Sequence, residues 1–281
     1  MKVEKSSKFV EFGKGLHTKY PSLRPGIKLI KILFFSKPRF SGWGMKTDHQ
    51  LPWVDEYDGE VFRKTNVGIK KIFKFNKKMV GIDENNIDTL LWRHWVVISA
   101  IRYSIKFSES KDFNFVECGV GEGTSTYFAL KEITEQQKIT NFHFHLYDAW
   151  DTMLQKQLVK NELSNIHTYN ELNLNITKSN LHEYEKYIIY HQGYIPDSFK
   201  TEPESPNFIS YLHIDLNAVN PTMDALEFFY PKLAKGGVIL FDDYGWDVYI
   251  DTKLAIDNYF KDLPGMLFKL PTGQAIYFKH E

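Results

Sequence analysis

Short apolar runs of strand length alternate with helical stretches through the C-terminal part of this 281-residue chain. Runs that are apolar on both faces and separated by helices are typical of a parallel sheet covered on both sides. The predicted strands are Phe113–Val120, Phe142–Asp148, Ile188–Gly193, Phe208–Asp215 and Val238–Asp243. The alternation therefore predicts an α/β domain built on a doubly wound, mostly parallel sheet.

The C-terminal tail departs from this alternation. Met266–Leu270 and Gln274–Lys279 are two apolar runs joined by Pro271, Thr272 and Gly273, a sequence typical of a hairpin turn. The sheet is therefore expected to end in an antiparallel hairpin strand. Five parallel strands followed by such a hairpin are the strand content of the class I methyltransferase fold, which resembles a dinucleotide-binding sheet with a reversed strand added.

The character of the chain changes near residues 108–112, so we divide it into residues 1–110 and 111–281. Between Asp88 and Lys106 apolar side chains recur at helical spacing, which predicts a helix with Asp88 as its N-cap. This helix is expected to pack a mostly helical N-terminal extension onto the sheet domain.

Hydrophobic residues make up 43% of the chain, which excludes a disordered protein, and 35 Lys and Arg balance 35 Asp and Glu. This balance argues against nucleic acid as a partner. Residues 1–80 are nevertheless basic, with 18 Lys and Arg against 7 Asp and Glu, which hints at an anionic acceptor. Such a segment can also touch an anionic membrane, but docked helices with solvated lysines are more common, so we expect no membrane contact.

The most apolar stretch of the basic region, Ile27–Phe35, is interrupted by Lys28 and Lys31. It is far shorter than the roughly 20 residues that a membrane-spanning helix needs, and it is not typical of a signal peptide. Cys118 is the single cysteine, so no intramolecular disulfide can form, which fits a reducing compartment. We therefore expect a cytoplasmic protein, and the sequence leaves a homo-oligomer open.

A glycine-rich turn follows the first predicted strand and precedes a helix. Gly119, Gly121 and Gly123 let the backbone approach a ligand closely, and the helix N-terminus supplies N–H groups. The fingerprint of nicotinamide and flavin enzymes needs a further glycine at position 124, where this chain has Thr124. The alternative interpretation is a tight turn between strand and helix that binds nothing.

The spacing E-x-G-x-G-x-G, which starts at Glu117, resembles motif I of S-adenosylmethionine-dependent methyltransferases. The resemblance implies that the glycines pass under the methionine part of the cofactor. The next strand ends in Asp148, where an acidic residue in such folds bonds the ribose hydroxyls; the alternative is that Asp148 caps the next helix. Trp150 and Trp246 follow strand ends and could line the adenosine or the acceptor pocket. The expected cofactor-binding residues are Glu117, Gly119, Gly121, Gly123, Thr124, Asp148 and Trp150.

Three aspartates, Asp215, Asp242 and Asp243, stand at the carboxyl ends of the fourth and fifth predicted strands. The carboxyl ends of neighbouring parallel strands lie side by side, so these carboxylates should converge. Like charges this close repel unless a cation compensates them, and all-oxygen ligands suit Mg²⁺. We therefore predict a Mg²⁺ site here; the alternative is that the aspartates only cap helices. His213 shares a strand face with Asp215 and could relay a proton, although a core histidine bonded to a neighbour is more common.

Four segments occur in an order that resembles the macrocin O-methyltransferase family, which methylates sugar hydroxyls of antibiotics. They are Glu117–Gly123, Gly193–Ser198, Leu212–Asn217 and Lys235–Gly245, and the resemblance covers residues 112–245. It implies a magnesium site on Asp215, Asp242 and Asp243. The family often has an aspartate, the candidate general base, where this chain has Asn217. An amide cannot accept the proton, so this position departs from the family.

The sequence thus predicts an S-adenosylmethionine-dependent O-methyltransferase, assisted by Mg²⁺, that acts on a hydroxyl of a small-molecule, sugar or glycan-like acceptor. Asp215 is the expected catalytic carboxylate. In the family, the region that corresponds to residues 1–110 forms a lid over the active site and shapes the acceptor pocket. Two alternatives stay open: a nucleotide-binding oxidoreductase, which Thr124 disfavours, and a catalytically degenerate methyltransferase-fold binding module, to which Asn217 lends weight.

Overall fold

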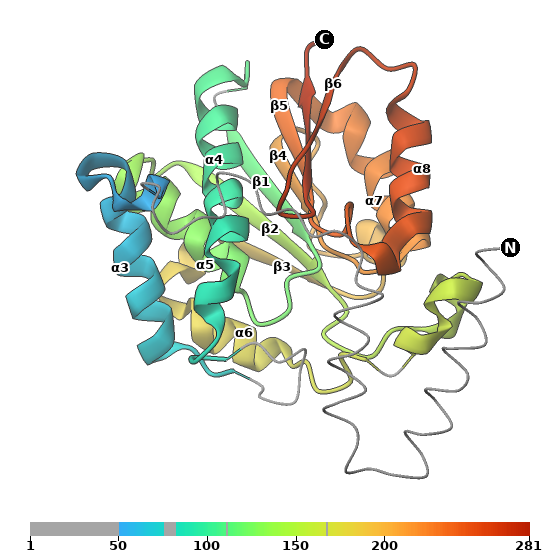
Figure 1. Ribbon diagram of the computed structural model, residues 1–281, viewed down its shortest axis with the longest axis horizontal. Coiled ribbons are helices and arrows are strands. Elements are labelled where there is room, and N and C mark those ends of the chain that lie inside the picture. Colours follow the sequence, from blue (N-terminus) through green and yellow to red (C-terminus); the bar gives the residue numbers. More distant parts are fainter. Residues whose placement is uncertain (1–50, 76–82, 111, 167) are drawn as a thin grey trace, which may run out of the picture. The chain divides into compact units, whose positions relative to one another are not determined.

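The structure is a computed structural model that describes residues 51–75, 83–110, 112–166 and 168–281 (Figure 1). Leu51–Glu281 form one compact unit. The predictions for the basic stretch Ile27–Phe35 lie outside the described residues. Within the part of the chain that is described, no helix has the length and apolar character needed to cross a membrane.

Seven strands form one sheet in the order β3-β2-β1-β4-β5-β7-β6 (Figure 1). Their bounds are β1 Phe113–Cys118, β2 Phe142–Asp148, β3 Ile188–Gln192, β4 Ile209–Ile214, β5 Leu233–Phe241, β6 Gly265–Lys269 and β7 Ala275–Lys279. The first five strands pair in parallel, and β7 runs antiparallel to both β5 and β6. This confirms the doubly wound, mostly parallel sheet with a C-terminal antiparallel hairpin.

Side chains of the central strands enter two separate cores, one on each face of the sheet. In β1, Phe113 and Phe115 belong to the first core, whereas Val116 and Cys118 belong to the second. Successive residues of a strand point to opposite faces, so burial on both faces requires an unbroken apolar run. This is why these strands could be recognised in the sequence.

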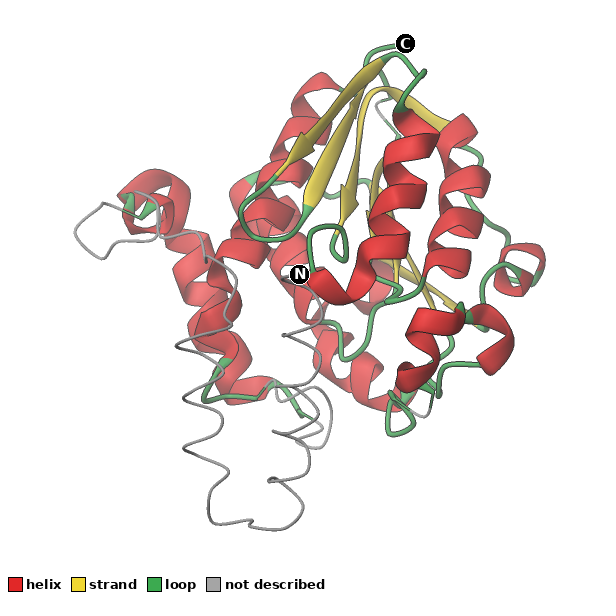
Figure 2. Ribbon diagram, turned by 45° about the vertical axis from the view of Figure 1, so that its right-hand side comes forward, coloured by secondary structure: helices red, strands yellow, loops and turns green. Residues whose placement is uncertain are grey.

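Helices flank the sheet on both faces (Figure 2). Their bounds are α3 Glu56–Ile72, α4 Leu91–Phe107, α5 Thr124–Lys131, α6 Leu174–Leu181, α7 Val219–Phe229 and α8 Ile250–Phe260. Residues of α3, α4, α5 and α6 share the first core, and residues of α7 and α8 share the second. The described helices that precede the sheet in the chain, α3 and α4, therefore cover one of its faces. The proposed division at residue 110 stays a prediction.

The chain order reverses between β1 and β4, because β2 and β3 extend the sheet on one side while β4 and β5 extend it on the other. Backbone hydrogen bonds continue beyond the strand ends there: Gly119 N donates to Tyr147 O at 2.8 Å, and Asp215 N donates to Cys118 O at 2.8 Å. Such a reversal opens a crevice at the carboxyl ends of the strands, where ligands bind in folds of this class.

The prediction that Asp88 caps the helix after it is wrong. A 3-10 turn at Ile87–Leu90 precedes α4, and the N-cap position is Leu90, with no capping bond from a side chain. The carboxylate of Asp88 instead accepts hydrogen bonds at 2.7 Å from Asn66 Nδ2 and Lys70 Nζ of α3. The cation and amide on α3 thus draw the carboxylate away from the helix terminus.

An ion pair with a buried carboxylate joins α4 to the π-helical turn that follows α5 on the same face of the sheet. Arg102 donates from Nε to Glu132 Oε1 at 2.7 Å and from Nη2 to Oε2 at 3.0 Å, and the side chain of Glu132 is 1% exposed. Glu132 begins the π-helical turn that extends α5. The pair therefore fixes α4, which also contributes to the cavity described below, to the sheet domain.

We expect Arg102→Ala to lower the free energy of unfolding by about 3 to 5 kcal/mol, because it leaves the buried carboxylate of Glu132 without its cationic partner and with only the amide of Gln137 as a side-chain donor. Urea denaturation followed by circular dichroism measures this loss. Lys64→Ala is the control, since Lys64 pairs with Glu60 on the exposed face of α3 and should barely shift the midpoint. Equal, small shifts for both variants would contradict the structural role of the Arg102 pair.

Candidate active site

A cavity of about 590 Å³ opens at the carboxyl ends of the parallel strands. Its lining includes seven carboxylic acids, Glu117, Glu122, Asp148, Asp151, Asp215, Asp242 and Asp243. Among the described residues that line it, Arg93 is the one Lys or Arg. Because carboxylates far outnumber basic side chains, this cavity favours a cationic ligand, a metal ion or both.

The glycine turn forms one wall of the cavity and has a left-handed backbone at each predicted glycine. The φ angles are +86° at Gly119, +56° at Gly121 and +88° at Gly123. A Cβ atom on Gly119 would overlap the backbone carbonyl of Asp215, whereas no atom lies within 4 Å of a Cβ atom on Gly121. Gly119 is therefore needed for packing, and Gly121 keeps the backbone bare where it faces the cavity.

Asp148 ties the end of β2 to the glycine turn. Its Oδ2 accepts hydrogen bonds from Val120 N at 2.7 Å and Gly121 N at 2.9 Å, and its Oδ1 accepts one from Trp150 N at 2.7 Å. Burial raises the pKa of this carboxyl, and the three N–H groups oppose that shift. Each oxygen has two lone pairs, so Oδ1 can still accept a hydrogen bond from a ligand.

The alternative that Asp148 caps the next helix is wrong, because Leu154 occupies the N-cap of the following turn. The predicted contact between Asp148 and ribose stays a prediction.

The two tryptophans that follow strand ends differ in position. Trp150 is buried and donates from Nε1 to Thr177 Oγ1 at 2.9 Å and to Gly121 O at 3.1 Å, so it braces the glycine turn. Trp246 lines the cavity and is 49% exposed.

Glu117 and Thr124 flank the same turn. Thr124 is the first residue of α5 and lines the cavity. Both oxygens of the buried Glu117 carboxylate have partners within the protein: Oε2 accepts from the hydroxyl of Thr126, and Oε1 lies 3.1 Å from His213 Nδ1. Glu117 thus connects β1, α5 and β4, and its expected contact with the cofactor stays a prediction.

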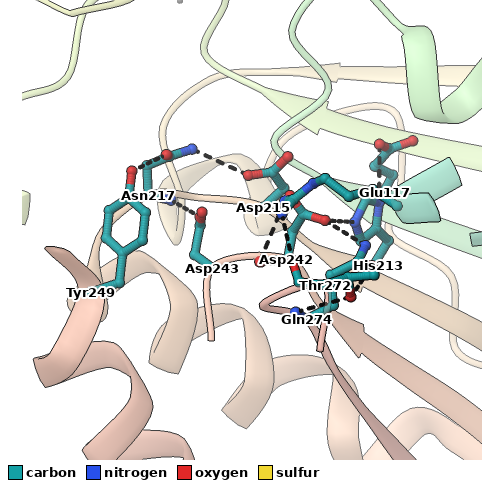
Figure 3. Close-up of polar contacts among 10 residues, drawn as sticks. Glu117, His213, Asp215, Asn217, Asp242, Asp243, Tyr249, Thr272 and Gln274 are labelled. Carbon is teal, nitrogen blue, oxygen red and sulfur yellow. Dashed lines mark hydrogen bonds and ion pairs between the residues drawn. The ribbon is translucent and has the colours of Figure 1, made fainter. Parts of the chain in front are cut away.

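The three predicted metal ligands also line the cavity, and they follow β4 and β5 (Figure 3). Asp215 Oδ1 accepts a hydrogen bond from Asn217 Nδ2 at 3.2 Å, and Asp243 Oδ2 accepts one from Asn217 N at 2.8 Å. Asp242 Oδ1 accepts from Gln274 Nε2 at 2.7 Å. The predicted convergence of carboxylates at this edge of the sheet is therefore present.

Burial, together with the neighbouring charge of Asp215, raises the pKa of Asp243 well above its usual value. A hydrogen bond between the two carboxyl groups acts in the same direction. In the absence of a cation the Asp243 carboxyl is therefore expected to be harder to ionise than an ordinary aspartate.

Arg93 is the functional residue that sequence reasoning missed. It lies in the first turn of α4, and its guanidinium forms an ion pair with Asp242 Oδ2. It also stands 5.4 Å from the centre of the Trp246 ring. No local signal connects residue 93 with residue 242, because the contact arises only when α4 packs on the sheet.

Three ligand atoms fit a single cation most closely. One ring nitrogen of His213, one oxygen of Asp215 and one oxygen of Asp242 all lie within 4.8 Å of one another. Asp243 is not in this group among the described residues and instead lies toward Asn217 and Tyr249 (Figure 3). The donors present fit a divalent cation, with Asp215 and Asp242 as its carboxylate ligands.

The two glycines give a matched pair of variants. Gly119→Ala is expected to abolish or severely reduce folding, because its Cβ atom meets the backbone of Asp215. Gly121→Ala should cost only the strain of a left-handed backbone, about 1 to 2 kcal/mol. Gly121→Leu should in addition weaken binding of S-adenosylhomocysteine at least 10-fold while the fold persists. Urea denaturation measures the stability and calorimetry the affinity for S-adenosylhomocysteine. An unchanged affinity in Gly121→Leu would contradict the assignment of the turn to the cofactor site.

Comparisons with known proteins agree with this geometry. Residues 116–244 match a family described as a methyltransferase domain. The solved O-methyltransferase NovP is similar, with 18% identity, a TM-score of 0.59 and coverage of 68% of this chain and 81% of that one. The calicheamicin methyltransferase CalS11 is also similar, with 12% identity, a TM-score of 0.52 and coverage of 86% and 99%. No curated protein matches significantly in sequence. The chain thus has the class I methyltransferase fold, and its match to the methyltransferase domain spans the glycine turn and the acidic cluster.

Proposed function

We propose that this chain is an S-adenosylmethionine-dependent methyltransferase that transfers the methyl group to oxygen, on a hydroxyl of a sugar or glycan-like small molecule. The observation that carries the proposal is that one cavity is lined both by the glycine turn with Asp148 and by the acidic cluster of Asp215, Asp242 and Asp243. A sulfonium cofactor on the glycine turn would present its methyl group to a hydroxyl held at the acidic cluster.

The aromatic and polar residues that line the cavity support a sugar as the acceptor. Tyr169, Trp246 and Tyr249 line it together with the polar side chains of Asn86 and Thr89. Flat aromatic rings beside hydrogen-bonding groups suit a ligand that is apolar on its faces and polar at its rim. NovP is described as an O-methyltransferase and CalS11 as a calicheamicin methyltransferase, and the resemblance to the macrocin O-methyltransferase family points the same way.

Asp215 is the proton acceptor in this proposal. The side chain of Asn217 cannot take the role, because its Nδ2 donates to Asp215 and its Oδ1 accepts from the hydroxyl of Tyr249. Asn217 instead holds Asp215 in place, and its backbone N–H holds Asp243. Alignment of the oxygen with the methyl group, and exclusion of water from the cavity, would supply much of the rate.

A divalent cation, Mg²⁺ in our sequence prediction, would be held by Asp215 and Asp242, with Asp243 beside them. When bound, such a cation lowers the pKa of a hydroxyl that it contacts. Arg93 pairs with Asp242, so it balances part of the carboxylate charge of the cluster and orients one of its members.

The remaining expectations are proposals of the same kind. We propose that the described part of residues 1–110 shapes the acceptor side, since Asn86, Thr89, Leu90 and Arg93 line the cavity. We also propose a cytoplasmic protein that acts on a small molecule without contact to nucleic acid or membrane.

Methyl transfer from labelled S-adenosylmethionine to a panel of hydroxylated sugars and nucleotide sugars tests the proposed reaction. We expect turnover on at least one member, its loss in EDTA, and its recovery when a divalent cation is returned. Asp215→Asn should reduce kcat by at least 100-fold with little change in the affinity for S-adenosylhomocysteine, because the amide keeps the shape and loses both the charge and the proton acceptor. Full turnover in EDTA would contradict the proposed dependence on a divalent cation. Transfer to nitrogen acceptors alone would contradict the proposed hydroxyl acceptor.

Asn217→Asp tests how the proton leaves. The new carboxylate would lie beside Asp215, where the amide now donates at 3.2 Å, so it should raise the pKa of that pair. If Asp215 is the proton acceptor, we expect the acidic limb of the pH profile of kcat to move to higher pH. Asn217→Ser, which adds no charge, is the control. A rise in kcat at an unshifted pH profile would show instead that the wild-type site lacks an adequate base.

A further inference from the structure

One nitrogen of the buried His213 imidazole has no partner. His213 lies on β4 and is 1% exposed, and its Nδ1 lies 3.1 Å from Glu117 Oε1. Its Nε2 has no hydrogen-bond partner in the structure. Buried polar atoms are almost always satisfied in folded proteins, so an orphaned nitrogen beside the acidic cluster requires a physical reason.

Glu117 determines which nitrogen of the ring carries the proton. The carboxylate already accepts from the Thr126 hydroxyl at Oε2, and its Oε1 can only accept from His213 Nδ1. In a neutral imidazole, Nε2 then bears a lone pair and no hydrogen. A carboxylate behind one imidazole nitrogen, with the other nitrogen bare, is the arrangement in which histidine binds metal ions.

The bare nitrogen faces two carboxylates (Figure 3). Nε2 lies 3.8 Å from Asp242 Oδ1. One ring nitrogen of His213 and one oxygen each of Asp215 and Asp242 lie within 4.8 Å of one another, and Nδ1 is the nitrogen next to Glu117, so Nε2 is the one available to this group. Ligands at about 2.1 Å from one ion stand at most about 4.2 Å apart, so small side-chain rotations would bring all three onto one cation. Gln274 uses only one of the two lone pairs of Asp242 Oδ1.

We propose that His213 is a metal ligand through Nε2, with Glu117 as the carboxylate that orients it, and with Asp215 and Asp242 as the oxygen ligands. A site with one nitrogen suits a transition-metal dication such as Mn²⁺ or Co²⁺ better than Mg²⁺, because Mg²⁺ takes oxygen ligands and imidazole is a ligand of transition metals. The inference rests on the divalent-cation site of the proposed function, although it does not depend on the methyl transfer.

The competing arrangement is an imidazolium that pairs with Asp242. A separation of 3.8 Å is too long for a hydrogen bond. Asp242 also has a counter-ion already, since Arg93 pairs with its Oδ2. A second positive charge is therefore better supplied by a metal ion between His213 and Asp215 than by a proton on His213.

Electron spin echo envelope modulation of the full chain loaded with Mn²⁺ tests the ligand directly. A bound imidazole nitrogen modulates the echo of the metal spin, so we expect ¹⁴N modulation in the wild type and the ¹⁵N pattern when the histidines are ¹⁵N-labelled. His213→Asn should lose the modulation, because its amide nitrogen can replace Nδ1 as donor to Glu117 but nothing replaces Nε2. His143→Asn, at an exposed position on β2, is the control and should keep it.

Calorimetric titration with the metal salts alone gives the second readout. We expect wild-type protein to bind Co²⁺ more tightly than Mg²⁺, and His213→Asn to lose at least 10-fold in affinity for Co²⁺ with less than a 3-fold change for Mg²⁺. Glu117→Gln should weaken Co²⁺ binding by about 10- to 100-fold, as is usual when the carboxylate behind a ligating histidine is removed.

Mn²⁺ that binds without nitrogen modulation in the wild type would overturn the assignment of His213 and leave an all-oxygen site standing. Full modulation in His213→Asn would overturn it equally. Absence of binding for every cation would overturn both this inference and the metal part of the proposed function, while methyl transfer in EDTA would then identify an enzyme that works without a metal.

Discussion

The ends of β1 and β4 touch through their backbones at Gly119 and Asp215, and the geometry of the cavity follows from this contact. A side chain at Gly119 would overlap the carbonyl of Asp215, and Asp215 N donates to Cys118 O at 2.8 Å. The contact brings the glycine turn, which would carry the cofactor, beside the first carboxylate of the acidic cluster. Because both residues continue the hydrogen bonding of the sheet, neither wall of the cavity can shift without disturbing the core strands.

The electrostatics of the cavity depend on groups from distant parts of the chain. Arg93 reaches Asp242 from α4, Gln274 reaches it from the turn before β7, and Glu117 lies behind His213. Each polar side chain of the cluster therefore restrains another, which leaves the oxygen atoms that face the cavity with few orientations. Such preorganised charge suits a reaction in which positive charge is transferred and a proton is released.

Local patterns were sufficient for much of the fold. The strands and the glycine turn could be predicted because burial on both faces and a left-handed backbone each leave a signature within a few residues, as at Phe115 and Gly121. The convergence of Asp215 and Asp242 followed from the rule that parallel strand ends lie side by side. Asp88 was assigned to a helix cap because the sequence does not show that Lys70 of α3 stands next to it.

The rest of the site depends on packing across long sequence separations. Arg93 and Gln274 meet Asp242 only when α4 and the hairpin lie on the sheet, so neither could be read from its neighbours in the chain. His213 was expected as a core histidine bonded to a neighbour, and Glu117 is that neighbour. The orphaned Nε2 is visible only in three dimensions, because it depends on what the side chains of β1 and β5 leave unfilled.

The central claim is that the glycine turn and Asp148 bind S-adenosylmethionine, and ligand titration tests it most directly. Isothermal titration calorimetry of the full chain with S-adenosylhomocysteine and, separately, with NAD would decide the question. We predict saturable binding of S-adenosylhomocysteine and no heat of binding with NAD at the same concentrations. Binding of NAD without binding of S-adenosylhomocysteine would contradict the account and would favour a nucleotide-binding oxidoreductase.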